Sequence, residues 1–227
     1  MIEKLIDDYL LAEQVKKADR IRSGLWSPSS FGRCFRNQFW NRKNEPQTNP
    51  PDLRALKIFK VGNLFHDFIQ GMLPNCQHEV IVKYDDIFGY ADIVTEDTVI
   101  DIKSQHSKGF WYMEQKDYDI NKEKETNILQ VCTYAWILNK PKASLFLVSK
   151  DDLCVKEYGF SVENWIPKIE EELKTLRGYW DKNELPEAKP RAFGGKEGKY
   201  CGFLDKCLSM GFDCIKNKPK EEQNGNT

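Results

Sequence analysis

The most informative part of the sequence is Gly89-Tyr90-Ala91-Asp92-Ile93-Val94, followed after a short turn by Val99-Ile100-Asp101-Ile102-Lys103. Apolar and β-branched residues dominate both runs, which predicts two adjacent antiparallel strands. Side chains alternate along a strand, so Asp101 and Lys103 share one face and lie about 7 Å apart along it. Asp92 can join that face from the partner strand. The pattern predicts two carboxylates and one ammonium converging at the edge of a sheet.

Groups in this arrangement suit the hydrolysis of phosphodiesters. Hard carboxylate oxygens hold Mg²⁺ or Mn²⁺, which neutralises a scissile phosphate and acidifies a bound water. An ammonium beside the metal stabilises charge that develops in the transition state. The structural alternative is an exposed Asp/Lys pair on an amphipathic strand, which is common. The Gly-x-x-Asp stretch shortly upstream favours the metal site.

Hydrophobic periodicity and turn residues predict the elements on either side of these strands. Helices are expected at 2–21, at 27–40 with Pro28 in the first turn, at 53–73, at 127–138, and from a cap at Ser161 to about 180. Strands are expected at 78–84, 88–94, 99–103, 144–149 and 154–160. Residues 104–125 show no clean period. The order predicts an α/β fold in which helices flank a central sheet, with N-terminal helical and C-terminal cysteine-bearing additions.

Composition excludes several classes of protein. The chain has 227 residues, of which 40% are apolar and 30% charged, so one globular domain at 1–215 and a disordered tail at 216–227 are expected. No apolar run is long enough to span a bilayer, and the N-terminal residues do not resemble a secretory signal. Seven cysteines without an export signal predict a reducing, cytoplasmic compartment and no closed disulfide framework.

Basic residues concentrate near the N-terminus. Residues 14–43 contain eight basic residues and one acid, although the whole chain has a net charge of −1. The aromatic residues interleaved with them are Trp26, Phe31, Phe35, Phe39 and Trp40. Because phosphates need cations and unstacked bases need a π surface, this segment is expected to bind a nucleic-acid strand through Arg22, Arg33 and Arg36. The alternative is a solvated helix face beside aromatic core residues.

Two further pairs of residues stand on predicted helices. Gly62-x-x-x-His66 places an imidazole away from an apolar stripe that we expect to be buried. The members of that stripe are Phe65, Phe68, Ile69 and Met72. Gln130 and Tyr134 are four residues apart, hence on one face of their helix, where they can contact the lysine or a phosphate. A lone helical histidine is more often structural than a ligand, so from the residues alone both roles of His66 stay open.

Taken in order, these motifs resemble those of the RecB-like PD-(D/E)XK nucleases. They are Ser27-Pro28-Ser29-Ser30-x-x-x-Cys34, Gly62-x-x-x-His66, Gly89-Tyr90-Ala91-Asp92, Asp101-Ile102-Lys103 and Gln130-x-x-x-Tyr134. The similarity covers 27–207 and is greatest to the CRISPR-associated exonucleases and their phage relatives. It implies a restriction-endonuclease-like core. It also implies metal binding by His66, Asp92, Asp101 and the Ile102 carbonyl, catalysis by Lys103, and support from Gln130 and Tyr134. Asp101 stands where many relatives have Glu, a shorter reach that the family tolerates.

The cysteines depart from the family pattern. Relatives with an iron–sulfur cluster carry one cysteine after the Ser-Pro-Ser helix start and three near the C-terminus, spaced C-x₂-C-x₅-C. Cys34, Cys201 and Cys207 match, but position 198 is glycine, and Cys214 is a candidate replacement because thiolates close in space form such a site. Four thiolates would also suit zinc. Cys76, Cys132 and Cys154 are expected to be ordinary buried cysteines. Loss of the [4Fe-4S] cluster is the outcome that the altered spacing slightly favours.

The resemblance implies a Mg²⁺- or Mn²⁺-dependent deoxyribonuclease. It would be an exonuclease acting on single-stranded DNA or duplex ends, in recombination, repair or phage DNA processing, within the cytoplasm of a bacterium or a phage-infected cell. The alternatives are a catalytically silent single-strand-binding module and a structure-specific endonuclease. Asp92, Asp101 and Lys103 together favour the enzyme, because a silent binder has no need to keep three such charges together.

Overall fold

The computed structural model describes residues 2–18 and 23–215, and its centre is one mixed five-stranded sheet. The strands, adjacent in chain order, are β1 (Gln77–Tyr84), β2 (Ile87–Val94), β3 (Thr98–Gln105), β4 (Lys142–Ser149) and β5 (Val155–Ser161). Only β3 and β4 pair in parallel, and the other neighbours are antiparallel. The predicted α/β fold with a central mixed sheet is confirmed, and the predicted strands differ from these by a few residues at their ends.

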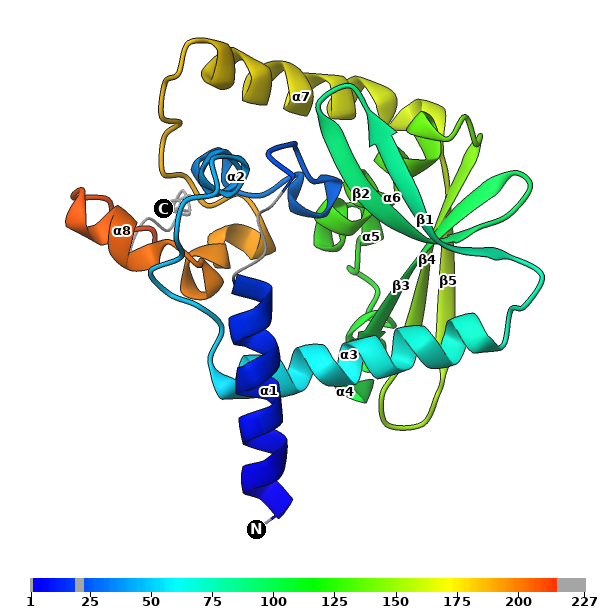
Figure 1. Ribbon diagram of the computed structural model, residues 1–227. Helices are drawn as coiled ribbons and strands as arrows, with labels where there is room; N and C mark the ends of the chain where they lie inside the picture. Colours follow the sequence, from blue (N-terminus) through cyan, green and yellow to red (C-terminus); the bar gives the residue numbers. More distant parts are fainter. Residues whose placement is uncertain (1, 19–22, 216–227) are drawn as a thin grey trace, which may run out of the picture.

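Helices pack on both faces of this sheet. They are α1 (Ile2–Ala18), α2 (Phe35–Arg42), α3 (Leu53–Gly71), α4 (Ser107–Tyr112), α5 (Ile120–Glu123), α6 (Glu125–Ile137), α7 (Ile166–Asp181) and α8 (Leu204–Ser209). Short 3₁₀ turns are η1 (Pro28–Ser30), η2 (Val162–Asn164), η3 (Phe193–Gly195) and η4 (Glu197–Tyr200). In Figure 1, α3 crosses one end of the sheet and α7 crosses the other.

The parallel pair β3–β4 requires a crossover, which α4, α5 and α6 supply. Its main element is α6, whose Ile128 and Val131 are fully buried in the largest core. The same core contains Ile169 and Leu176 of α7, so α6 lies between the sheet and α7. On the opposite face, Ile69 of α3 packs against Ile93, Ile102 and Val148 of the sheet. The central strands are therefore covered on both sides.

The helix predicted at 27–40 is broken in two. Turn η1 ends at Ser30 and α2 begins at Phe35, because Gly32 between them has a φ of 77°, which an α-helix does not contain. A Cβ at Gly32 would come within 3.1 Å of side chains on α6. Cys34 is consequently the residue that precedes the first turn of α2.

The structure corrects two further predictions, one on burial and one on the start of a helix. On α3 only Ile69 of the expected stripe is fully buried, whereas Phe68 is 47% and Met72 is 55% exposed, because the helix touches the sheet along a narrow strip. The predicted cap at Ser161 does not start the last long helix. Turn η2 intervenes, and α7 follows Trp165 without a side-chain hydrogen bond at its start.

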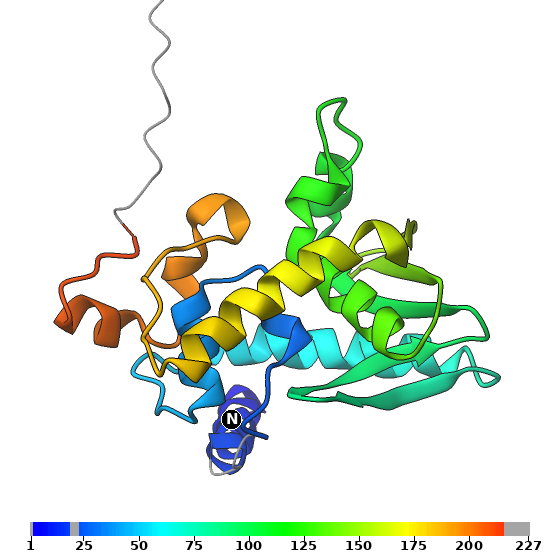
Figure 2. The same ribbon diagram turned by 90° about the horizontal axis from the view of Figure 1, so that it is seen from above.

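The aromatic residues of the basic segment lie in the core. Those at most 4% exposed are Trp26, Phe31, Phe39 and Trp40, while Phe35 is partly buried. Trp26 packs edge-on against Trp180 of α7, and Trp40 packs against Phe203. Figure 2 shows α7 lying along the segment that contains α2. The predicted π surface for nucleic-acid bases is therefore wrong for these four residues, which belong to the core as the structural alternative expected. The solvated helix face of that alternative is not borne out, because Arg36 on α2 is also buried.

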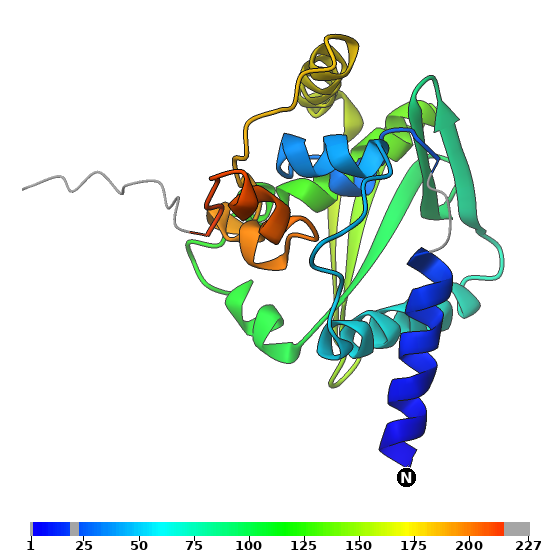
Figure 3. The ribbon, with the colours of Figure 1, turned by 60° about the vertical axis from the view of Figure 1, so that its left-hand side comes forward.

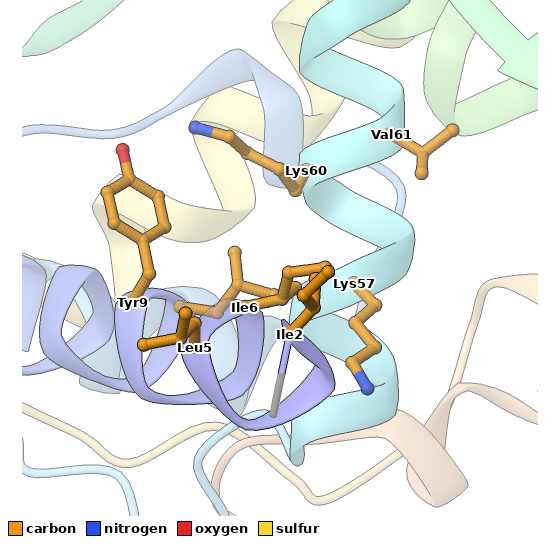
Figure 4. Close-up of a pocket in the computed structure, with 8 residues that line it drawn as sticks. Ile2, Leu5, Ile6, Tyr9, Lys57, Lys60 and Val61 are labelled. Carbon is orange, nitrogen blue, oxygen red and sulfur yellow. The ribbon is translucent and has the colours of Figure 1, made fainter.

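Helix α1 packs against the first half of α3, and the two enclose an apolar groove (Figure 4). Leu10 is buried, but Ile2 and Leu5 are 73% and 65% exposed. An ion pair of 2.7 Å joins Asp7 to Lys57. Residues 19–22 of the predicted first helix and the predicted tail at 216–227 lie outside the described residues. In the part that is described, no helix is both long and apolar enough to cross a membrane.

Candidate functional site

Strands β2 and β3 separate at the motif that the sequence singled out. Their pairing includes Val94 with Val99 and Ile93 with Ile100, and then ends. Beyond it the Asp92 carboxylate takes the place of a ladder partner, since its Oδ2 accepts a hydrogen bond from the Ile102 amide at 2.8 Å. We call this separation the strand fork. It lies between central strands, so the predicted position at a sheet edge is wrong.

A distortion of β1 and β2 re-aims Asp92. Ala91 and Val94 belong to the core beneath α6, whereas Ile93 packs against α3, so the usual alternation shifts at Asp92. Across the ladder from Asp92, between two regular pairs, Glu79 has a φ of 48°. This left-handed conformation is uncommon for glutamate and costs about 1–3 kcal/mol. Neighbouring structure maintains it, and the result is that both carboxylates point toward α3.

Three potential metal ligands meet beside the fork. Ligand atoms of His66, Glu79 and Asp92 all lie within 4.8 Å of one another, and His66 Nδ1 is 3.5 Å from Asp92 Oδ2. Gln70, one turn after His66 on α3, holds the arrangement. Its Nε2 donates to Glu79 Oε1 at 3.0 Å and to the Asp92 carbonyl at 3.1 Å. One imidazole and two carboxylates are a suitable donor set for Mn²⁺ or Mg²⁺.

Asp101 and Lys103 share a face of β3, as the alternation predicted. Asp101 is 2% exposed, and Lys103 Nζ lies 2.8 Å from its Oδ1 and 2.7 Å from its Oδ2. The ammonium hydrogen bonds to Oδ1, whereas the buried Oδ2 receives no well-directed hydrogen bond. A carboxylate oxygen left in this state has a lone pair available to a cation.

Electrostatics at the fork favour a bound cation. Burial raises the pKa of Asp92 to about 7, and repulsion from the Asp101 carboxylate adds to this. Burial, followed by the positive charge of Lys103, lowers the pKa of His66, so its imidazole is neutral and able to act as a ligand near pH 7. A divalent cation would offset the carboxylate repulsion that otherwise favours protonation of Asp92.

Tyr134 approaches the fork from α6. Its hydroxyl oxygen accepts hydrogen bonds from the Gln130 side chain and the Tyr90 amide. Burial, followed by the charges of Asp101 and Asp92, raises the pKa of Tyr134, so the hydroxyl stays protonated. A Cβ at Gly89 would lie only 2.5 Å from this hydroxyl, which explains the glycine of the Gly-Tyr-Ala-Asp motif. The structure thus brings Gln130 and Tyr134 together as one hydrogen-bonded pair beside the two aspartates.

Three residues near the fork were not identified from sequence. Glu79 and Gln70 lie against Asp92, and Lys124 lies near Lys103. Burial and the positive charge of Lys103 both lower the pKa of Lys124. Burial is the larger of these two causes. The four-residue spacing from His66 to Gln70 was a usable signal. Glu79 had none, because its place follows from strand register, and Lys124 falls in the stretch without a clean period.

The predicted strand-binding arginines have different environments. Arg36 is 4% exposed, its Nε donates to the Pro186 carbonyl at 2.6 Å, and its guanidinium lies 4.2 Å from the centre of the Phe212 ring. These contacts give Arg36 a structural role and remove it as a strand-binding candidate. Arg33 is exposed, 5.7 Å from the centre of the Phe193 ring. Arg22 lies outside the described residues.

The four cysteines of the expected cluster lie close together, although Cys34 is distant in sequence from the other three. Cys34, at the start of α2, lies against the C-terminal segment that carries Cys201, Cys207 and Cys214 (Figure 3). Of the three expected to be ordinary buried residues, Cys132 is buried, Cys76 is partly buried and Cys154 is exposed, so that prediction is wrong for Cys154.

Comparison with known proteins shows similarity at the level of the fold. The chain superposes on the crystal structure of SSO0001 with a TM-score of 0.56 and 18% identity, over 91% of this chain and 96% of that one. It superposes on the alkaline exonuclease from Laribacter hongkongensis with a TM-score of 0.50 and 11% identity, over 71% of this chain and 90% of that one. No protein-family profile matches the chain, and no curated protein matches it in sequence. The fold is therefore one that a known exonuclease shares.

Proposed function

We propose that the chain is a divalent-metal-dependent deoxyribonuclease of the RecB-like PD-(D/E)XK class, acting as an exonuclease on single-stranded DNA or duplex ends. The observation that carries this proposal is the strand fork, where His66, Glu79 and Asp92 adjoin the buried Asp101 and Lys103. The similarity of fold to an alkaline exonuclease supports it.

The residues that would hold the metal are His66, Asp92 and Asp101, with the Ile102 carbonyl, and Glu79 as an additional carboxylate. When bound, Mg²⁺ or Mn²⁺ would neutralise the scissile phosphate and acidify a water. The imidazole in the set favours Mn²⁺, which accepts nitrogen more readily. The Oδ2 of Asp101, which accepts no well-directed hydrogen bond, and the raised pKa of Asp92 both fit a site that requires a cation.

The chain's own side chains have separate tasks in this proposal. Lys103, held by Asp101, places an ammonium where negative charge develops on the phosphate. Tyr134 and Gln130 fix the α6 side of the fork, because the Tyr134 hydroxyl fills the space left by Gly89. Lys124 adds positive charge on the same side, and Arg33 is the remaining described candidate for contact with the strand.

The test is digestion of end-labelled linear single-stranded DNA, a circular single strand and a linear duplex by the full chain, with Mg²⁺, with Mn²⁺ or with a chelator. We expect the linear substrates to be degraded with either metal, the circle to survive, and the chelator to stop the reaction. Cleavage of the circle would instead identify an endonuclease. Binding of the strands without cleavage under either metal would identify a silent binding module.

A further inference from the structure

Arg33 lies beside a second basic stretch, far along the chain. Residues 189–200, which include the turns η3 and η4, contain four basic residues and one acid, Glu197. The Arg33 carbonyl accepts a hydrogen bond from Arg191 Nη1 at 3.1 Å, and the Arg33 guanidinium lies 5.7 Å from the centre of the Phe193 ring. The positive charge of the N-terminal segment is therefore continued by residues about 160 positions away in sequence.

The exposed cations of this surface have no carboxylate beside them. They are Arg33, Lys189, Lys196 and Lys199. Among the ion pairs of the described residues, none includes any of these four, whereas Arg191 pairs with the buried Glu172 at 2.6 Å. The nearest exposed acid in sequence is Glu187, which precedes the stretch. Cations without a carboxylate partner are available to the phosphates of a nucleic acid.

The one acid of the stretch is turned inward. Glu197 is 8% exposed, its Oε1 accepts from the Cys34 amide at 2.6 Å, and its Oε2 accepts from the Ala192 amide at 3.1 Å. Burial raises the pKa of Glu197, and the hydrogen bonds from these amides act against that shift. The contacts hold the two turns against the start of α2. They also keep the carboxyl away from solvent, so the outer face of the turns is positive.

Two aromatic side chains of the stretch are exposed. Phe193 is 51% and Tyr200 is 82% exposed. Phe193 also has a φ of 54°, a left-handed conformation that is unfavourable for a bulky residue. Backbone strain of this kind is found preferentially at functional sites, and here burial of the ring does not offset it. Exposed rings beside cations are what the unstacked bases of a single strand require.

Neighbouring groups connect this surface to the strand fork. Gly32, directly before Arg33, lies against the first turn of α6, since a Cβ at Gly32 would be 3.1 Å from Thr126 Cγ2. Lys124, just before α6, is close enough to Lys103 for that charge to lower its pKa, in addition to the larger effect of burial. Figures 2 and 3 both show η3 and η4 (orange) on the same side of the molecule as the crossover between β3 and α6 (green).

We propose that Arg33 and the turns η3 and η4 hold the single-stranded part of a DNA substrate, with Lys196 and Lys199 on its phosphates and with Phe193 and Tyr200 against its bases. This inference rests on the proposed nuclease function, because the strand then runs from these turns past the start of α6 to the fork. A duplex would offer the turns its phosphates but not its stacked bases, so a single strand is the better partner. The aromatic surface is thus supplied by the C-terminal part of the chain.

The first test measures the contribution of charge. A labelled single strand of about 20 nucleotides, longer than the usual site, is bound to the full chain in a chelator, over a series of salt concentrations, and followed by fluorescence anisotropy. K196A/K199A removes two cations of the surface, and K83A/K174A is the matched control, because it removes two exposed lysines of β1 and α7. We expect K196A/K199A to bind about 10-fold more weakly at low salt and to reduce the salt slope by about 1.4, and the control to match the parent.

The second test measures the contribution of the ring at 193. F193N removes the ring, and asparagine tolerates the left-handed conformation better than phenylalanine, so the thermal midpoint should not fall. We expect the single strand to bind about 5-fold more weakly or worse, with an unchanged salt slope, because stacking releases no counterions. Binding of a blunt duplex of the same length should not change.

Three outcomes would overturn the proposal. They are parental affinity and salt slope in K196A/K199A, an equal loss in K83A/K174A, and parental binding of the single strand by F193N. Cleavage with Mn²⁺ is measured separately. A parent that cleaves no DNA but shows the expected differences in binding would refute the nuclease proposal and leave this surface in place. A parent that cleaves DNA, with unchanged binding in the variants, would do the reverse.

Discussion

The strand fork and the cysteine group, which consists of Cys34, Cys201, Cys207 and Cys214, both gather side chains of types that can bind a metal, but they are assembled in different ways. At the fork, Asp92, Asp101 and Lys103 come from one hairpin, and a backbone distortion in β1 and β2 accompanies the approach of Asp92 to His66 of α3. The cysteine group joins α2 to the C-terminal segment, and a buried glutamate ties the two together. Local strand geometry places Asp101 and Lys103 of the first site, whereas long-range packing determines the whole of the second.

The largest expected effect is at the fork. D101N keeps the size of the side chain but removes the charge that holds Lys103 and leaves a weaker metal ligand. We expect cleavage of linear DNA to fall by about 100-fold or more, with an unchanged thermal midpoint. D97N is the matched control, because Asp97 is an exposed aspartate of the β2–β3 turn paired with Lys142. Equal activity in D101N and D97N would remove Asp101 from the site.

The next prediction tests whether α6 completes the fork through packing. G89A forces a methyl group to within 2.5 Å of the Tyr134 hydroxyl, so we expect a loss of about 1–3 kcal/mol in unfolding free energy and a clear loss of activity. G159A on β5 is the control, since a Cβ there has no heavy atom within 4 Å. Chemical denaturation of both variants measures the difference. Similar stabilities would mean that Tyr134 moves aside at no cost.

A third prediction separates backbone strain from function at Glu79. Asparagine tolerates the left-handed conformation better than glutamate, so E79N should not lower stability. The substitution shortens the side chain and replaces its carboxylate with a neutral amide, so we expect the affinity for Mn²⁺ to fall about 10-fold. Calorimetric titration with Mn²⁺ and urea denaturation give the two readouts, and E96N in the β2–β3 turn is the control. An unchanged affinity for Mn²⁺ would mean that Glu79 is not a metal ligand.

The smallest expected effect is on the connection between the two regions. Asp86, in the β1–β2 turn, binds Arg42 of α2 at 2.9 Å and Arg177 of α7 at 2.6 Å. Burial acts to raise the pKa of Asp86, but the hydrogen bonds from Arg177 and Arg42 outweigh it and hold the pKa below its usual value. We expect D86N to cost about 1–2 kcal/mol at pH 7.

The sign of the pH dependence follows from that lowered pKa. Stability from a carboxylate with a depressed pKa is fully present above the unfolded value near 4 and is lost as the pH falls through the folded value. The difference between the parent and D86N should therefore shrink below about pH 4 in urea denaturation. D85N is the control, because Asp85 is largely exposed and pairs only with Arg177 among the described ion pairs. A difference that grows in acid would contradict this assignment.

Relations between residues of the same helix or strand could be predicted from the sequence. Alternation in 89–103 placed Asp101 and Lys103 on one face, and the helical spacing placed Gln130 beside Tyr134, because each relation depends on the backbone period alone. The strands were found to within a few residues for the same reason. The large helices at 53–71 and 125–137 were also recognisable from their apolar periodicity.

Contacts between residues of different helices and strands could not be predicted in this way and follow from the folded structure. The position of the fork at the centre of the sheet, the approach of Glu79 to His66 and Asp92, and the burial of Arg36 depend on register and on packing partners far along the chain. The period of a helix or strand shows on which face a residue lies, but not which other element covers that face. For this reason the aromatic residues of the basic segment were expected to be open to nucleic-acid bases, although they belong to the core. The role of Gly198 could not be predicted either, because a residue without a side chain contributes to no hydrophobic or polar pattern. Its importance follows from Cys214, which occupies the space where a Cβ of residue 198 would lie.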